Sequence, residues 1–178
     1  MSTPYRRSSP GRAGSFSVNR EALSQGIGWL VPALTTLTFL VFSALPWGLI
    51  GLPRTAPALG LMAVYIWAVR RPSSMPLGLA FGLGLVQDLL WGEPLGLWGA
   101  GFVAGTMAAR AVHTPFHVDS LTVHWLGFLY VLGVTSVLVW LLACLYYGQF
   151  LSFGPLLGQG LLTAAFYPLG AFLLRSVR

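Results

Sequence analysis

Charged residues are scarce in this chain. Asp, Glu, Lys and Arg make up 8% of its 178 residues and apolar residues 56%, whereas a soluble domain contains about 25% charged residues. Residues 22–53 and 120–174 contain none of the four charged types, and about 20 apolar residues are enough to cross a bilayer. This composition excludes an ordinary soluble fold and predicts an all-α, polytopic integral membrane protein.

Lysine is absent, and cysteine occurs once. All ten basic residues are Arg, and they outnumber the four acidic residues to give a net charge of +6. Nucleic-acid binding would need a clustered basic face with aromatic residues among the charges, but these arginines stand at the ends of apolar runs. Cys144 alone can form neither an internal disulfide nor a thiol-rich metal site. The basic charge therefore indicates a membrane topology signal, and no nucleic-acid partner is expected.

Residue patterns typical of catalysis or metal binding are also missing. The sequence shows no serine nucleophile beside a base, no phosphate-binding glycine loop and no pair of carboxylates within the apolar runs. His113 and His117 have the spacing of a helical zinc pair and Asp119 is near, but Pro115 between them disfavours a shared regular helix. We therefore expect no catalytic residue, no metal site and no cofactor.

The chain divides into a tail and a membrane domain. Residues 1–25 are rich in Ser, Pro, Gly and Arg and have almost no large aliphatic side chains, so they cannot bury a core and are expected to form a disordered, basic cytoplasmic tail. Residues 26–178 are expected to form the transmembrane domain. It contains six apolar runs separated by turn residues, at 26–46, 56–69, 75–91, 95–110, 121–146 and 155–174.

The arginines indicate how these six runs cross the bilayer. With both termini in the cytoplasm, nine of the ten arginines fall on the inner side and only Arg54 falls outside, as the positive-inside rule favours. The second to fourth runs reach only about 21 to 26 Å of a hydrocarbon core of ~30 Å. Either the bilayer thins there, the helix ends extend into the loops, or this region includes a re-entrant element.

Glycine and tryptophan add weaker expectations about packing. Small residues four apart allow helices to approach closely, and such pairs occur at Gly78 and Gly82, Gly92 and Gly96, Gly101 and Gly105, and Gly154 and Gly158. The seven tryptophans mostly fall near the ends of the proposed spans, which is typical of an aromatic belt at the membrane interfaces.

Asp88 is the most informative residue because it lies between apolar runs. A carboxylate near a bilayer midplane costs about 2.5 to 3.5 kcal/mol on insertion scales, so it must have a partner or a role. Gly92 and Pro94 predict a tight turn between two helices shortly after it. The first amides of the next helix, around Leu95 to Leu97, are the expected hydrogen-bond donors to Asp88, and Arg54 is a second candidate partner.

The segment around Asp88 also resembles a known family. From Gly84 to Gly96 it reads Gly-Leu-x-x-Asp-x-x-x-Gly-x-x-Leu-Gly, and it is preceded by Tyr65-x-Trp67, Arg71-Pro72 and Pro76. This pattern is similar to the signature of the MreD family, membrane subunits of the bacterial cell-elongation machinery. The resemblance implies a non-catalytic scaffold in the bacterial inner membrane that binds the single-span protein MreC. Through that complex it would also act with RodA, its class B penicillin-binding partner and MreB.

The turn and the resemblance together select a set of candidate residues for a structural hairpin and a partner-binding surface: Arg54, Gly84, Asp88, Gly92, Glu93, Pro94 and Gly96. An alternative function is a small-molecule carrier, because the MreD family is similar in architecture to the substrate-binding subunits of energy-coupling-factor transporters. A carrier needs a pocket with several convergent polar groups, and few polar side chains are available in the expected outer loops.

Overall fold

A computed structural model describes residues 28–44, 57–113 and 121–175 of the chain. Every regular element in these ranges is helical, which confirms the predicted all-α class. The elements are α2 (Leu30–Ser43), α3 (Leu59–Arg70), the short 3-10 helix η2 (Pro72–Ser74), α4 (Leu77–Trp91), α5 (Leu97–His113), α6 (Leu121–Tyr147) and α7 (Gly154–Arg175). The predicted tail at residues 1–25 lies outside the described residues.

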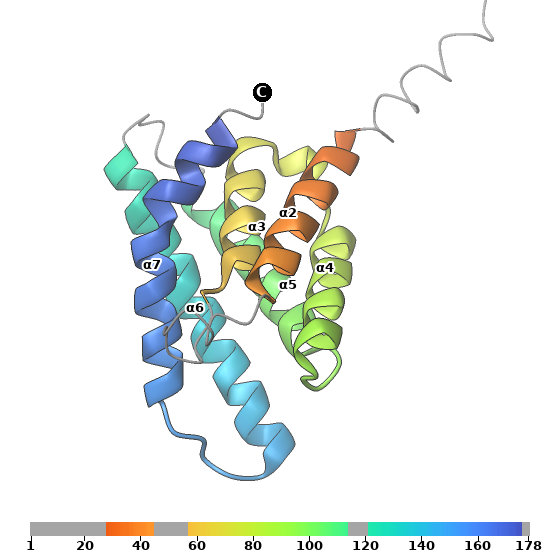
Figure 1. Ribbon diagram of the computed structural model, residues 1–178, viewed down its shortest axis with the longest axis vertical. Helices are drawn as coiled ribbons and strands as arrows, with labels where there is room; N and C mark the ends of the chain where they lie inside the picture. Colours follow the sequence, from red (N-terminus) through yellow and green to blue (C-terminus); the bar gives the residue numbers. More distant parts are fainter. Residues whose placement is uncertain (1–27, 45–56, 114–120, 176–178) are drawn as a thin grey trace, which may run out of the picture.

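Consecutive α-helices run in opposite directions along one bundle (Figure 1). The start of α2, η2 and the end of α7 lie at one end of the bundle, here called the arginine end. The α4–α5 turn and the α6–α7 loop lie at the other end, here called the hairpin end (Figure 1). The described arginines fall at the first of these ends, at positions Arg70, Arg71, Arg110 and Arg175.

The α3 helix forms the centre of the bundle. Its residues from Leu59 to Val69 are all buried, and it packs against α2, α5, α6 and α7. Its sequence is apolar on every side, as expected of a helix that other helices surround completely. At its amino end, the amide of Ala58 donates a hydrogen bond of 2.9 Å to the Thr163 hydroxyl of α7, which ties the central helix to the outer layer.

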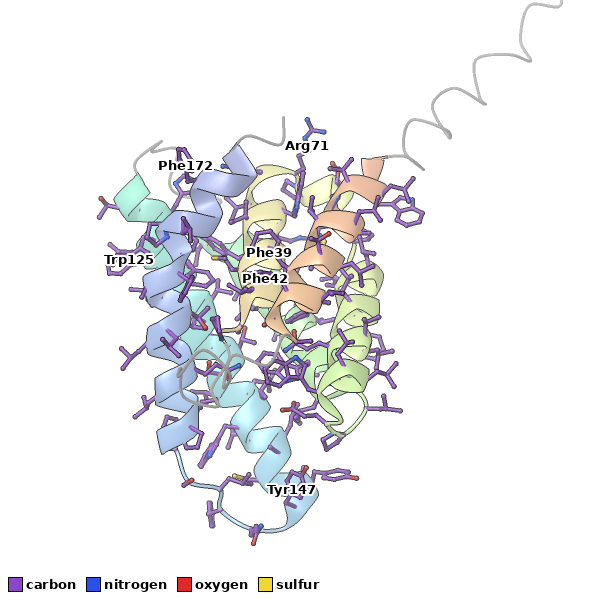
Figure 2. All side chains as sticks on the ribbon, in the orientation of Figure 1. Phe39, Phe42, Arg71, Trp125, Tyr147 and Phe172 are labelled. Atoms are coloured by element: carbon purple, nitrogen blue, oxygen red, sulfur yellow. The ribbon has the colours of Figure 1, made fainter. Side chains whose placement is uncertain are left out.

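Apolar side chains cover the outside of the bundle, while several polar side chains lie inside it. Leu145 is 80% exposed and Phe172 is 74% exposed, whereas Thr106, Thr135 and Asp88 are fully buried. In Figure 2, Trp125 and Phe172 lie toward the arginine end and Tyr147 toward the hairpin end. A surface of this kind in water would be a strong aggregation hazard, and it is suited to contact with lipid.

The structure does not by itself establish six membrane spans. In the described part of the chain, Thr122–Tyr147 is a helix of 26 residues that is long and apolar enough to cross a bilayer. The apolar helices α2, α3 and α4 have 14, 12 and 15 residues, which is less than the ~20 usually required. The six-span topology with both termini inside therefore stays a prediction.

Two of the tryptophans that were expected in an interfacial aromatic belt are buried inside the bundle instead. Trp67 is buried, and its Nε1–H donates a hydrogen bond of 2.9 Å to the hydroxyl of Thr35. Trp98 is also buried and packs edge-on against Phe102. Each indole ring fills space between helices and finds a polar partner for its N–H, which is a common use of buried tryptophan.

The glycine pairs behave differently from one another. A Cβ atom added at Gly101 would lie 2.8 Å from a methyl carbon of Val139, and one added at Gly105 would lie 2.9 Å from the hydroxyl of Thr135. This pair therefore allows close contact between α5 and α6, as predicted. Gly78, Gly82 and Gly154 face open space, so the helix-packing expectation is wrong at those positions.

Candidate functional site at the α4–α5 hairpin

The turn between α4 and α5 depends on two glycines with positive φ angles. Gly92 ends α4 with φ of +66°, and the amide of Glu93 donates a 3.0 Å hydrogen bond to the Asp88 carbonyl, as in a Schellman motif. Gly96 has φ of +97° directly before α5. Other residue types are strained in this region, so both glycines are required by the turn. The chain reverses at the residues that the sequence indicated, but α5 begins at Leu97 rather than at residue 95.

The Asp88 carboxylate joins the two helices of the hairpin. Its Oδ2 accepts a hydrogen bond of 2.8 Å from the amide of Gly96, and its Oδ1 accepts one of 2.9 Å from the amide of Trp98. The Asp88 side chain lies on α4 and is fully buried. These donors lie in the region where the sequence analysis placed them. We call this arrangement the Asp88 clamp.

The clamp supplies hydrogen-bond acceptors to the amino end of α5. The first amides of an α-helix have no acceptor within the helix, and Gly96 has no side chain that could cap them. Because the amino end of a helix carries partial positive charge, a carboxylate is favoured there. Asp88 thus supplies from α4 the cap that α5 lacks in its own sequence, and the buried carboxylate is itself stabilised by two amides.

Gly84 brings the two helices close enough for the clamp to form. A Cβ atom at this position would lie 2.5 Å from the backbone nitrogen and Cα of Gly99 and from the carbonyl oxygen of Trp98. The α4 and α5 backbones are therefore in direct contact here. Gly84 and Asp88 are four residues apart and share one face of α4, so this contact places Asp88 opposite the first turn of α5.

Glu93 supports the same turn from its outer side. Its Oε2 accepts a hydrogen bond of 2.6 Å from the indole Nε1–H of Trp98, and the carbonyl of Pro94 accepts one of 3.2 Å from the amide of Leu97. Burial raises the pKa of the Glu93 carboxyl above its ordinary value. The hydrogen bond from Trp98 acts in the opposite direction, and the charge of Asp88 raises the pKa further. Asp88 is thus fully withdrawn from water and Glu93 partly so.

The structure brings six of the seven candidate site residues together in the hairpin. Arg54, the expected second partner of Asp88, lies outside the described residues. Sequence reasoning missed Trp98, which donates to both Asp88 and Glu93, and Gln87, the buried residue that precedes Asp88 on α4. Trp98 follows the turn by two residues, so the expectation of a capped helix start could have indicated its amide.

The arrangement can hold two helices in a fixed orientation. In the described ranges the carboxylates are Asp88 and Glu93, and both accept hydrogen bonds from the residues that follow the turn. These hydrogen bonds give both carboxylates a structural role. The residues of the hairpin therefore position α4 relative to α5.

The fold and the hairpin define a class of protein: an all-helical bundle with an apolar exterior and a buried polar clamp. The family model for rod shape-determining protein MreD matches residues 24–177. The chain belongs to the MreD family, and family membership makes it a membrane protein of the rod-shape system. Neither a curated protein nor a solved structure matches it.

Proposed function

We propose that this chain is a non-catalytic membrane scaffold of the bacterial cell-elongation complex that binds MreC and supports peptidoglycan synthesis. RodA, its class B penicillin-binding partner and MreB would be reached through the same complex. The observation that carries this proposal is the family match over nearly the whole chain. It implies a role in rod-shape determination, to which the proposal adds the partners and the absence of catalysis.

The hairpin supports a scaffold function because it is built for a fixed shape. Asp88 accepts a hydrogen bond that connects α4 to α5, Glu93 accepts one that connects the turn to α5, and the backbones touch at Gly84. A rigid element presents a constant surface to a partner, which lowers the conformational cost of binding. The apolar outer faces of α6 and α7 supply further area on which a single-span helix could pack.

We further propose six spans with both termini in the cytoplasm of a bacterial inner membrane. The separation of the described arginines from the acidic hairpin end favours this orientation. Alkaline phosphatase fused after Glu93 or Gln149 should be active, because the enzyme works only outside the cytoplasm, whereas fusions after Arg71 or His117 should be inactive. Activity after Arg71 would contradict the proposed orientation.

The scaffold function is tested by depletion and capture. Depleting the protein should make a rod-shaped cell round, and the tagged protein should capture MreC from solubilised membranes. Complementation with Gly84→Ala should fail and Gly82→Ala should succeed, because only the first change disturbs the hairpin. Cells that stay rod-shaped on depletion, or glycan polymerisation by the purified protein alone, would contradict the proposal.

A further inference from the structure

A cavity of about 600 Å³ opens at the hairpin end of the bundle. The α4–α5 turn forms one wall, α6 forms another, and the loop at residues 148–153 with the start of α7 completes it. The loop is held against α6, since the indole Nε1–H of Trp140 donates to the carbonyl of Leu151 at 3.1 Å and the amide of Leu151 donates to the sulfur of Cys144. The cavity walls are therefore fixed by the fold.

The charge of the cavity favours a cationic ligand. Among the described residues that line it, Glu93 carries a formal charge and there is no Arg or His. One Glu93 oxygen already accepts from Trp98, but a carboxylate can accept several hydrogen bonds. The rings of Trp91, Trp98 and Trp140 also line the cavity, and indole faces attract cations. An anion alone would meet an uncompensated carboxylate here.

The cavity also offers neutral hydrogen-bond donors. The side-chain amide of Gln149 and the hydroxyl of Ser152 lie in the lining, and both groups can donate a hydrogen bond. A ligand oxygen at this wall could therefore accept a hydrogen bond from a side chain that carries no charge. The cavity thus suits a ligand that carries an ammonium group and, a short distance away, acceptor oxygens.

The surroundings of the cavity point to a lipid as the source of that ligand. Phe150 is 93% exposed, Tyr146 is 67% exposed and Leu157 is 57% exposed. Phe150 lines the cavity, and the other two directly adjoin lining residues at the end of α6 and the start of α7. Aromatic residues of this kind concentrate at the depth of lipid head groups. A head group could enter the cavity while its acyl chains remain against the apolar outer face of α6.

We propose that this cavity binds the ammonium end of a phospholipid head group, with Glu93 as the anionic partner and the three tryptophans as its aromatic walls. An ethanolamine head group has the required chemistry: its ammonium pairs with Glu93, and its phosphate oxygens accept from the neutral side chains of Gln149 and Ser152. This inference does not depend on the proposed scaffold function. A cavity is also what the carrier alternative would require, but the proposed occupant is a membrane lipid.

The proposal predicts that lipid binding is linked to the ionisation of Glu93. Only the ionised carboxylate pairs with an ammonium group, so binding should be complete above the pKa of Glu93 and should weaken as the pH falls through it. Burial places that pKa above its ordinary value. Among the described residues, Tyr147 is the other titratable group in the cavity lining, and Asp88 lies close enough for its charge to raise the pKa of Glu93. Both are left unchanged in the variants below.

The test is retention of lipid by the purified protein. Protein extracted from bilayers with equal amounts of phosphatidylethanolamine and phosphatidylglycerol is analysed by native mass spectrometry. The wild type should retain the ethanolamine lipid about tenfold more than the glycerol lipid, the size expected of one charged hydrogen bond. Glu93→Gln keeps an acceptor for Trp98 but removes the charge, so it should lose this preference. Trp91→Phe should weaken retention, and Trp29→Phe, at the arginine end, should leave it unchanged.

Three results would overturn the proposal. The first is equal retention of the two lipids by the wild type, and the second is an undiminished preference in Glu93→Gln. The third is displacement of the lipid by free ethanolamine, which would assign the cavity to a soluble amine. If Glu93→Gln does not fold, the wild type at acidic pH gives the same comparison, and a preference that is unchanged as the pH falls would contradict a role for the Glu93 carboxylate.

Discussion

Two helical hairpins of this protein are built in opposite ways. The α4–α5 hairpin turns within five residues, its backbones touch at Gly84, and Asp88 fastens one helix to the start of the other. The α6–α7 hairpin has a six-residue connection that is fastened to α6 by Trp140, and its helices make far fewer close contacts with each other. The first hairpin is therefore fixed by polar bonds inside the bundle, whereas the second presents broad apolar faces.

The difference shows how polar groups are used inside an apolar bundle. Within lipid, apolar side chains gain little by packing together, so close backbone contact and interior hydrogen bonds carry more of the specificity. The α4–α5 hairpin has both, and its geometry should be sensitive to single atoms. The α6–α7 hairpin relies on its broad apolar faces, so its stability should tolerate single substitutions. Substitutions in the two hairpins test this difference.

The largest effect is expected at Gly84. In Gly84→Ala, the new methyl group would overlap the backbone of Gly99, and the helices must separate, which should cost about 3 kcal/mol and weaken the Asp88 clamp. Gly82→Ala is the matched control, because nothing lies near a Cβ atom there and alanine favours a helix by about 0.5 to 1 kcal/mol. Unfolding of the purified proteins in detergent measures both. Equal stability of the two variants would contradict backbone contact at Gly84.

A somewhat smaller effect is expected at Asp88. Removing the carboxylate in Asp88→Ala leaves the Gly96 and Trp98 amides without their acceptor, at a cost of about 2 kcal/mol. Asp88→Asn keeps one acceptor oxygen but turns an amide NH2 group toward the second donor. It should therefore lie between the wild type and Asp88→Ala. The free energy of unfolding in detergent measures this order.

An outcome in which Asn is as harmful as Ala to MreC capture, while both variants fold and insert normally, would mean that the charge of Asp88 has a role of its own. Proton or ligand handling would then replace the capping interpretation.

The smallest effect is expected in the α6–α7 hairpin. Trp140→Phe removes the hydrogen bond to Leu151 but keeps an aromatic ring against Phe153, so it should lower stability by only about 0.5 to 1 kcal/mol. Leu145→Ala, at a position that is 80% exposed, serves as a control with almost no effect. If Trp140→Phe destabilised the protein as much as Asp88→Ala, the contrast between the two hairpins would be wrong.

Much of this fold was predictable because its signals are local. The apolar runs placed each described helix to within a few residues, and Gly92 with Pro94 placed the turn. Asp88 could be assigned a partner because a carboxylate in an apolar run needs nearby donors, and the next helix start was the closest source. Hydrogen bonds between two helices that are joined by a short turn can therefore be predicted from the sequence.

Other features depend on which faces of distant helices meet, which a single sequence does not specify. Trp67 lies near the end of an apolar run, yet it is buried because α2 crosses over it and provides Thr35. Gly78 and Gly82 have the same spacing as Gly101 and Gly105, but only the second pair faces another helix. The aromatic cavity at the hairpin end likewise joins α4, α5, α6 and α7, and no local pattern predicts that meeting.

The exchange rate of the Trp98 backbone amide tests the Asp88 clamp most directly. An amide in the first turn of a helix has no intrahelical acceptor, so its protection from hydrogen exchange reports the Asp88 bond. In protein labelled with ¹⁵N at Trp and Ala, the Trp98 amide should exchange slowly in the wild type and much faster in Asp88→Ala. The Ala100 amide, which bonds the Gly96 carbonyl, should exchange at a similar rate in both. Equal exchange of the Trp98 amide in the two proteins would contradict the clamp.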